Sequence, residues 1–232
     1  MNKKINNRFT LIELLVVMGL MVLMVSLAMP AFSRMAGNNK VDVMASNIKT
    51  ALEQGQSTAV SRNCYVAVVF PLASDKADVK KYNFGGYRLA EVVQEPAGST
   101  TYKFTKWISE AYSNVPDGAL MVSDNSSKTE AYTAIKDAKL TLTDAKEDNF
   151  TKMTSVTATA TVTDFPDKCK AVIFKPTGEC VNEDMYICIA SADTGSLKIT
   201  NTSDFSFLYL NQFTGRVEYC SEGDEEPQNG GE

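Results

Sequence analysis

The sequence has no histidine among its 232 residues and a single tryptophan. The absence of histidine excludes Ser-His-Asp and Cys-His catalysis, histidine-ligated zinc and the usual general base near neutral pH. Acidic residues (28) outnumber lysine and arginine (23), and the formal charge of −5 argues against a global basic field that recruits nucleic acid. Apolar residues make up 44% of the chain, which is typical of a globular domain and not of a collagenous or disordered one.

A long apolar segment follows a short basic leader. Lys3, Lys4 and Arg8 precede it, and Glu13 is the only charged residue between Phe9 and Phe32. A helix needs about 20 apolar residues to cross a hydrocarbon core of about 30 Å. We therefore expect a membrane-spanning helix over residues 9–32. By the positive-inside rule, the leader (residues 1–8) is cytoplasmic, and the residues after the span lie on the opposite side of the membrane.

Two alternatives bear on this segment. Ser26-Leu27-Ala28 has the small-x-small pattern of a secretory signal cleavage site, although the apolar stretch is long for a signal peptide and contains an acid. The carboxylate of Glu13 either sits at the membrane interface, where the helix dipole favours a negative charge, or pairs with a positive group of another subunit.

The start of the apolar segment resembles a known motif. Phe9-Thr10-Leu11-Ile12-Glu13-Leu14-Leu15-Val16-Val17 is similar to the prepilin cleavage and methylation motif of type IV pilins and type II secretion pseudopilins. The resemblance implies that a prepilin peptidase cuts between Arg8 and Phe9 and methylates the new amino group. It also implies that Glu13 pairs with the N-terminal amine of a neighbouring subunit, and Pro30 matches the helix-kinking proline of the family. The family usually has glycine just before the cleavage site, where this sequence has Arg8. An arginine at that position resembles a variant of the motif that occurs in some lineages.

An amphipathic helix is predicted to continue the apolar one as a stem over residues 33–62. Apolar residues and glycine recur at steps of three and four, with polar residues between them: Val41, Met44, Ala45, Ile48, Leu52, Gly55 and Ala59. We expect this stripe to pack on the remainder of the chain. We also expect residues 9–62 to form one continuous helix, with the amphipathic segment following the apolar one.

From residue 63 to 220 the pattern is that of short β-strands separated by turn signals. Strands are expected at Tyr65–Phe70, Tyr82–Val93 (a pair broken at Gly85-Gly86), Tyr102–Ile108, Leu140–Thr143, Val156–Thr163, Ala171–Phe174, Tyr186–Ala190, Phe205–Leu210 and Arg216–Tyr219. This predicts an antiparallel two-sheet head, so the fold class is α+β: a long N-terminal membrane-spanning α-helix, the pilin stem, packed on a β head.

The head is similar to the minor pseudopilin and minor pilin group that includes the H-type pseudopilin and the fimbrial T protein. The matching stretches are Ala51–Arg62, Tyr65–Phe70, Trp107 with Val115–Gly118, Val172–Gly178 and Thr214–Val217. Residues 123–163 have no counterpart in that group.

Five cysteines follow the apolar segment and would therefore lie in an oxidising compartment: Cys64, Cys169, Cys180, Cys188 and Cys220. None forms a CxxC pair, so with histidine absent we expect no metal site. Two disulfides and one free thiol can form in several ways, of which we favour Cys169 with Cys188 on adjacent predicted strands. Residues 221–232, rich in acids and lacking bases, are expected to form a disordered acidic tail.

The sequence thus predicts a non-enzymatic filament subunit without a cofactor. It would be a minor pilin or pseudopilin anchored once in the bacterial inner membrane, with a cytoplasmic N-terminus and a periplasmic head. Its expected partners are the prepilin peptidase, other pilin or pseudopilin subunits, the inner-membrane assembly platform and membrane lipid, but not nucleic acid. Two alternatives remain: a DNA- or surface-binding minor pilin, and a single-span envelope protein that never polymerises.

Overall fold

The computed structural model describes residues 11–113, 117–131, 145–159 and 162–220, without the side chains of residues 27–39. The chain forms two units, residues 1–39 and residues 40–232. Helix α1 (Leu11–Arg62) contributes to both, so the predicted long N-terminal helix is confirmed over these residues. Over the described residues, no helix combines the length and apolar character that crossing a membrane requires. Parts of the expected span, residues 9–10 and the side chains of residues 27–32, lie outside the described residues.

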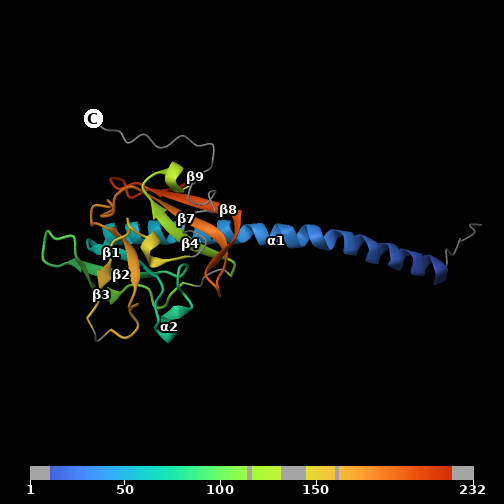
Figure 1. Cartoon of the computed structure of the whole chain (residues 1–232), viewed down its shortest axis with the longest axis horizontal. Helices are drawn as coiled ribbons and strands as arrows, with labels where there is room; N and C mark the ends of the chain where they lie inside the picture. Colours follow the sequence, from blue (N-terminus) through green and yellow to red (C-terminus); the bar gives the residue numbers. More distant parts are fainter. Residues whose placement is uncertain (1–10, 114–116, 132–144, 160–161, 221–232) are drawn as a thin grey trace, which may run out of the picture. The chain divides into compact units, whose positions relative to one another are not determined.

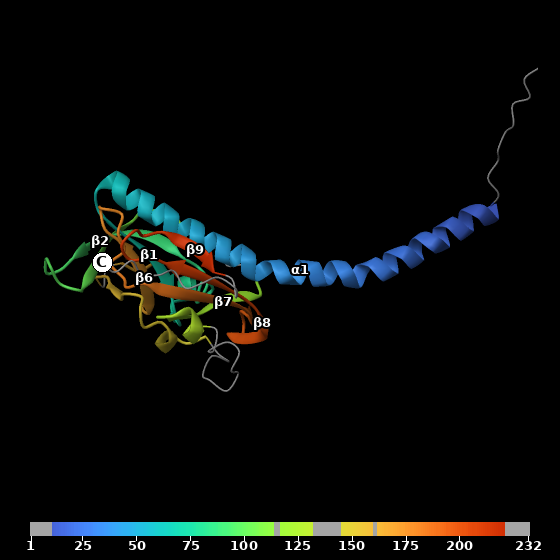
Figure 2. The same ribbon diagram turned by 90° about the horizontal axis from the view of Figure 1, so that it is seen from above.

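Within the second unit, one face of α1 is buried, as the apolar stripe predicts. Val41, Ala45, Ile48 and Leu52 are at most 1% exposed. Figure 2 shows residues 40–62 of α1 lying along the strands. Gly55 allows a close approach, because a Cβ atom there would lie 2.7 Å from Cγ2 of Val68. The stem helix is therefore part of the core and does more than connect the first unit to the head.

Two sheets make up the head (Figure 1). The five-stranded sheet has the order β5-β3-β2-β1-β6, and the four-stranded sheet has the order β4-β7-β8-β9. The strands are β1 (Tyr65–Pro71), β2 (Arg88–Gln94), β3 (Tyr102–Trp107), β4 (Ala119–Asn125), β5 (Val156–Thr157), β6 (Cys169–Phe174), β7 (Met185–Asp193), β8 (Lys198–Leu210) and β9 (Val217–Cys220). All named pairings are antiparallel except β3 with β5, so the predicted antiparallel two-sheet head is confirmed apart from that pair.

Three hydrophobic clusters hold these layers together. The central cluster joins the buried face of α1 to one face of each sheet, through side chains such as Phe70 and Phe174 on one sheet and Ile187 and Leu208 on the other. The outer face of the five-stranded sheet carries a second cluster, and the outer face of the four-stranded sheet a third. Successive side chains of a strand point to opposite faces of its sheet. Each sheet therefore contributes apolar side chains both to the central cluster and to its own outer cluster.

The segment without a counterpart, residues 123–163, helps to close the central cluster. Phe150 is 1% exposed in it, just after the short 3₁₀ helix η1 (Glu147–Asn149). The buried carboxylate of Asp124 on β4 accepts the backbone N–H groups of Thr151, Lys152 and Met153 at 2.7–3.0 Å. Burial raises the pKa of Asp124, although these three donors oppose that shift. The described part of this segment is therefore a structural element of the head.

Three strand predictions differ from the structure. The segment before Arg88 forms the short helix α2 (Ala77–Lys80) and turns, so Tyr82–Val93 is not a strand pair. The alternating run from Val156 forms only the two-residue strand β5, which pairs with Tyr102 and Lys103 of β3, and residues 160–161 of that run lie outside the described residues. The strand β4 was not predicted, and the predicted strand at residues 140–143 lies outside the described residues.

Candidate assembly interface

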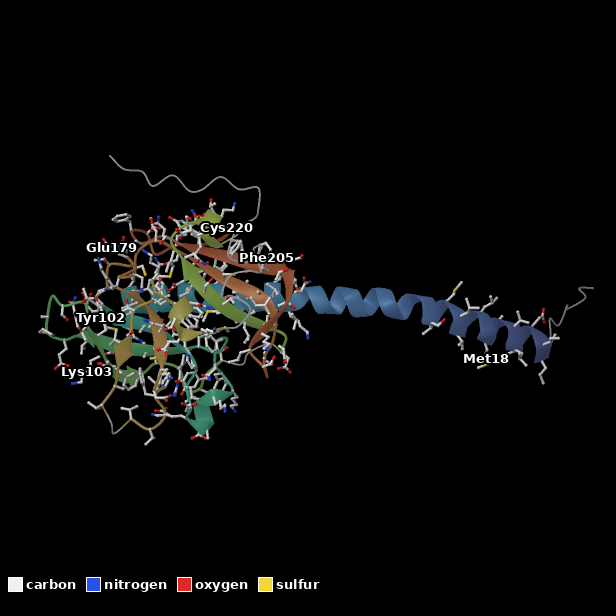
Figure 3. The ribbon with its side chains drawn as sticks, viewed as in Figure 1. Met18, Tyr102, Lys103, Glu179, Phe205 and Cys220 are labelled. Atoms are coloured by element: carbon white, nitrogen blue, oxygen red, sulfur yellow. The ribbon has the colours of Figure 1, made fainter. Side chains whose placement is uncertain are left out.

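Residues 11–25 of α1 present apolar side chains on every side. The exposed fractions of their large apolar side chains run from 48% at Val17 to 82% at Leu11. Figure 3 shows Met18 and its neighbours standing out from this part of the helix. A helix that is apolar all round belongs in a membrane or in the core of a larger assembly. This surface is the candidate site for assembly.

Glu13 lies in the first turn of α1, among these exposed apolar side chains. A carboxylate in the first turn is stabilised by the partial positive charge at the helix N-terminus. Two of the other predicted site residues, Arg8 and Phe9, lie outside the described residues. At Pro30 the backbone remains helical, and its side chain lies outside the description. Cleavage and N-methylation therefore stay predictions.

A side chain of α1 that the sequence did not single out ties the helix to two turns of the head. Nε2 of Gln56 donates to the backbone oxygen of Gly178 at 2.9 Å and to that of Thr214 at 2.6 Å. Gly215, in the second turn, has a φ of 64°, and a Cβ atom there would lie 2.3 Å from the oxygen of Gly178. One glutamine therefore holds both turns against the stem.

Arg88 forms a second structural centre, on the outer face of the five-stranded sheet. It is 8% exposed, and its Nη1 lies 2.6 Å from Oδ2 of Asp164. The same guanidinium donates to the backbone oxygens of Ser109 (3.1 Å) and Glu110 (2.7 Å) and lies 4.2 Å from the centre of the Trp107 ring. Burial acts to raise the pKa of Asp164, but the nearby Trp107 indole and the hydrogen-bonded Arg88 guanidinium lower it overall. The Arg88 guanidinium therefore anchors the loop after β3, at Ser109 and Glu110, and the loop that contains Asp164 to strand β2.

The favoured disulfide, Cys169 with Cys188, is wrong in this structure. No disulfide forms among the five cysteines, all of which lie in the described part of the chain. Cys169 belongs to the outer cluster of the five-stranded sheet and Cys188 to that of the four-stranded sheet, with the central cluster between them. The prediction failed because β6 and β7 are consecutive in the sequence but belong to different sheets.

The other cysteines also lie apart in the fold. Cys180 is in the central cluster, Cys64 is half-buried beside it, and Cys220 packs at the edge of the third cluster. Burial raises the pKa of the Cys169 and Cys180 thiols to about 12, and it also raises that of Cys188. These three thiols are therefore protonated and shielded from reagents.

Several basic side chains of the second unit form salt bridges with carboxylates. Among the described residues, salt bridges join Lys49–Glu53, Arg88–Asp164, Lys103–Glu95, Lys106–Glu91, Lys152–Glu183, Lys175–Glu179 and Arg216–Glu218. Across that part of the chain, no group of three or more acidic, cysteine or histidine side chains is placed to hold a metal ion. These salt bridges place charges of both signs next to each other on the surface. DNA binding instead requires a continuous patch of basic side chains.

Solved structures similar to this chain include two pilin-type proteins. No family model matches the chain, and no curated protein matches it. The type IV minor pilin FimU of Pseudomonas aeruginosa is 14% identical, with a TM-score of 0.41 over 82% of this chain and 94% of that one. The minor pseudopilin EpsH from the type 2 secretion system of Vibrio cholerae is 8% identical, with a TM-score of 0.40 over 80% and 99%. Both are of the kind that the sequence resembles.

Proposed function

We propose that this protein is a minor pilin or pseudopilin subunit that assembles through its N-terminal helix into a type II secretion or type IV pilus-like filament. The observation that carries the proposal is the apolar surface of residues 11–25 with one carboxylate, Glu13, at its start. Glu13 is the fifth residue counted from Phe9, as in the motif that Phe9–Val17 resembles.

In this proposal the precursor is held in the inner membrane by residues 9–32, with its N-terminus cytoplasmic and its head periplasmic. The prepilin peptidase removes residues 1–8 and methylates the amine of Phe9. The assembly platform then transfers the helix from lipid to the filament, where apolar contacts with other subunits replace contacts with lipid. A buried pair between Glu13 and a neighbour's amine sets the register of the helices more than it adds stability.

The head has a structural role in this proposal, and the chain is not an enzyme. Arg88 and Asp124 are buried charged groups, and each is held by contacts that fix loops to strands. Chemistry on a substrate needs a group that is free to reach it. Both groups instead stabilise the surface that the head presents to other subunits.

The proposal is tested by the intact mass and N-terminal sequence of the protein isolated from the membranes of its own host. A chain that begins at Phe9 with one added methyl group supports it. A chain that begins at Met1 refutes processing and indicates a single-span envelope protein that does not polymerise. A chain that begins near Met29 indicates an ordinary secretory signal.

The DNA-binding alternative has its own test in the salt dependence of DNA binding to the processed protein. Phosphate contacts weaken steeply as salt rises. Because the chain carries a formal net charge of −5, we expect no retention on DNA even at low salt. Retention at low salt that disappears as salt is raised would favour the alternative.

A further inference from the structure

We draw no further inference here: the strongest candidate, the exposed ring of Phe213 on the hydrogen-bonded turn between β8 and β9, is an apolar surface for which nothing in the structure shows what covers it.

Discussion

At the residue scale, the strongest constraints on this head come from a few positions where backbone and side chain leave no freedom. Gly215 combines a left-handed backbone with a carbonyl oxygen where a Cβ would stand. Gln56 spans the gap between two turns that are separated by more than 30 residues of sequence. Such positions are sensitive to substitution because strain and steric overlap add together.

Gly215→Ala should destabilise the head by about 2 kcal/mol or more, since it adds both backbone strain and a clash with the oxygen of Gly178. Urea unfolding followed by the fluorescence of the single tryptophan, Trp107, measures this change. Gly98→Ala is the matched control: Gly98 also has a positive φ, of 84°, but no atom lies within 4 Å of a Cβ there. If the two variants unfold alike, the close approach at Gly215 is not a constraint.

The cysteines allow a prediction about redox chemistry. Under non-reducing conditions the intact mass should correspond to five thiols, and a reductant should not shift the unfolding midpoint. Cys64 and Cys220 should react with a thiol reagent in the native state, because they are partly exposed, whereas Cys169, Cys180 and Cys188 should react only on unfolding. A native mass lower by about 2 Da per bridge, with a loss of about 2–5 kcal/mol on reduction, would contradict the structure.

Asp164 gives a pH dependence with a definite sign. Its folded-state pKa is lowered, so it stabilises the fold above the unfolded-state pKa of about 4, and this contribution is lost as pH falls through the folded value. Asp164→Asn should therefore be less stable than the wild type at pH 7, and the difference should shrink below about pH 4. Circular dichroism during urea unfolding at several pH values measures it, with the exposed Asp148→Asn as control. A difference that is constant with pH would show that the ion pair to Arg88 is not its cause.

At the scale of elements, both α1 and the segment after β4 contribute side chains to the core. Gly55 lets α1 approach Val68 of β1 closely. Asp124 holds residues 151–153 through three backbone donors, and Phe150 enters the central cluster beside Phe84. The Ser123–Thr163 segment is therefore joined to the fold through its described part.

Phe150→Ala should cost about 3–5 kcal/mol of unfolding free energy, because it removes a fully buried ring and leaves a cavity. Phe213→Ala is the matched control, since that ring is 72% exposed and its removal should change stability by less than about 0.5 kcal/mol. Thermal or urea unfolding of both variants measures the difference. Similar losses in the two would mean that the segment does not close the core.

At the scale of the whole molecule, the apolar surface of residues 11–25 is too extensive to face water. Each of its large side chains is about half exposed or more in a single chain. Burying one such side chain is worth about 1.5–3 kcal/mol, so covering this surface is strongly favourable, as the proposed assembly helix requires.

Glu13→Gln should reduce incorporation into filaments in the host while leaving the amount of protein in the membrane unchanged. The variant keeps the size of the side chain but removes the one charge that pairs with a neighbour's amine in the proposed filament. Quantifying the subunit in sheared filaments and in the membrane fraction measures this. Glu53→Gln, on the exposed face of the stem, is the control. Wild-type incorporation of Glu13→Gln would remove Glu13 from the assembly mechanism.

Local periodicity was enough to predict several parts of this protein. The amphipathic stripe from Val41 to Ala59 and the strands around Val66–Phe70 and Ala171–Phe174 follow from spacing along the chain, because helix and strand repeat on a scale of a few residues. Glu13 also stood out in the sequence alone, as an isolated charge in an apolar run. These features depend only on near neighbours in the chain.

Only the tertiary structure decided which distant segments meet. It assigned β6 and β7 to different sheets, which separates Cys169 from Cys188, and it brought Phe150 into the core. It also placed Gln56 between the turns at Gly178 and Gly215, and Arg88 against Asp164. Pairing between strands and contacts between loops depend on the path of the whole chain, since residues far apart in sequence carry no local signal of their meeting.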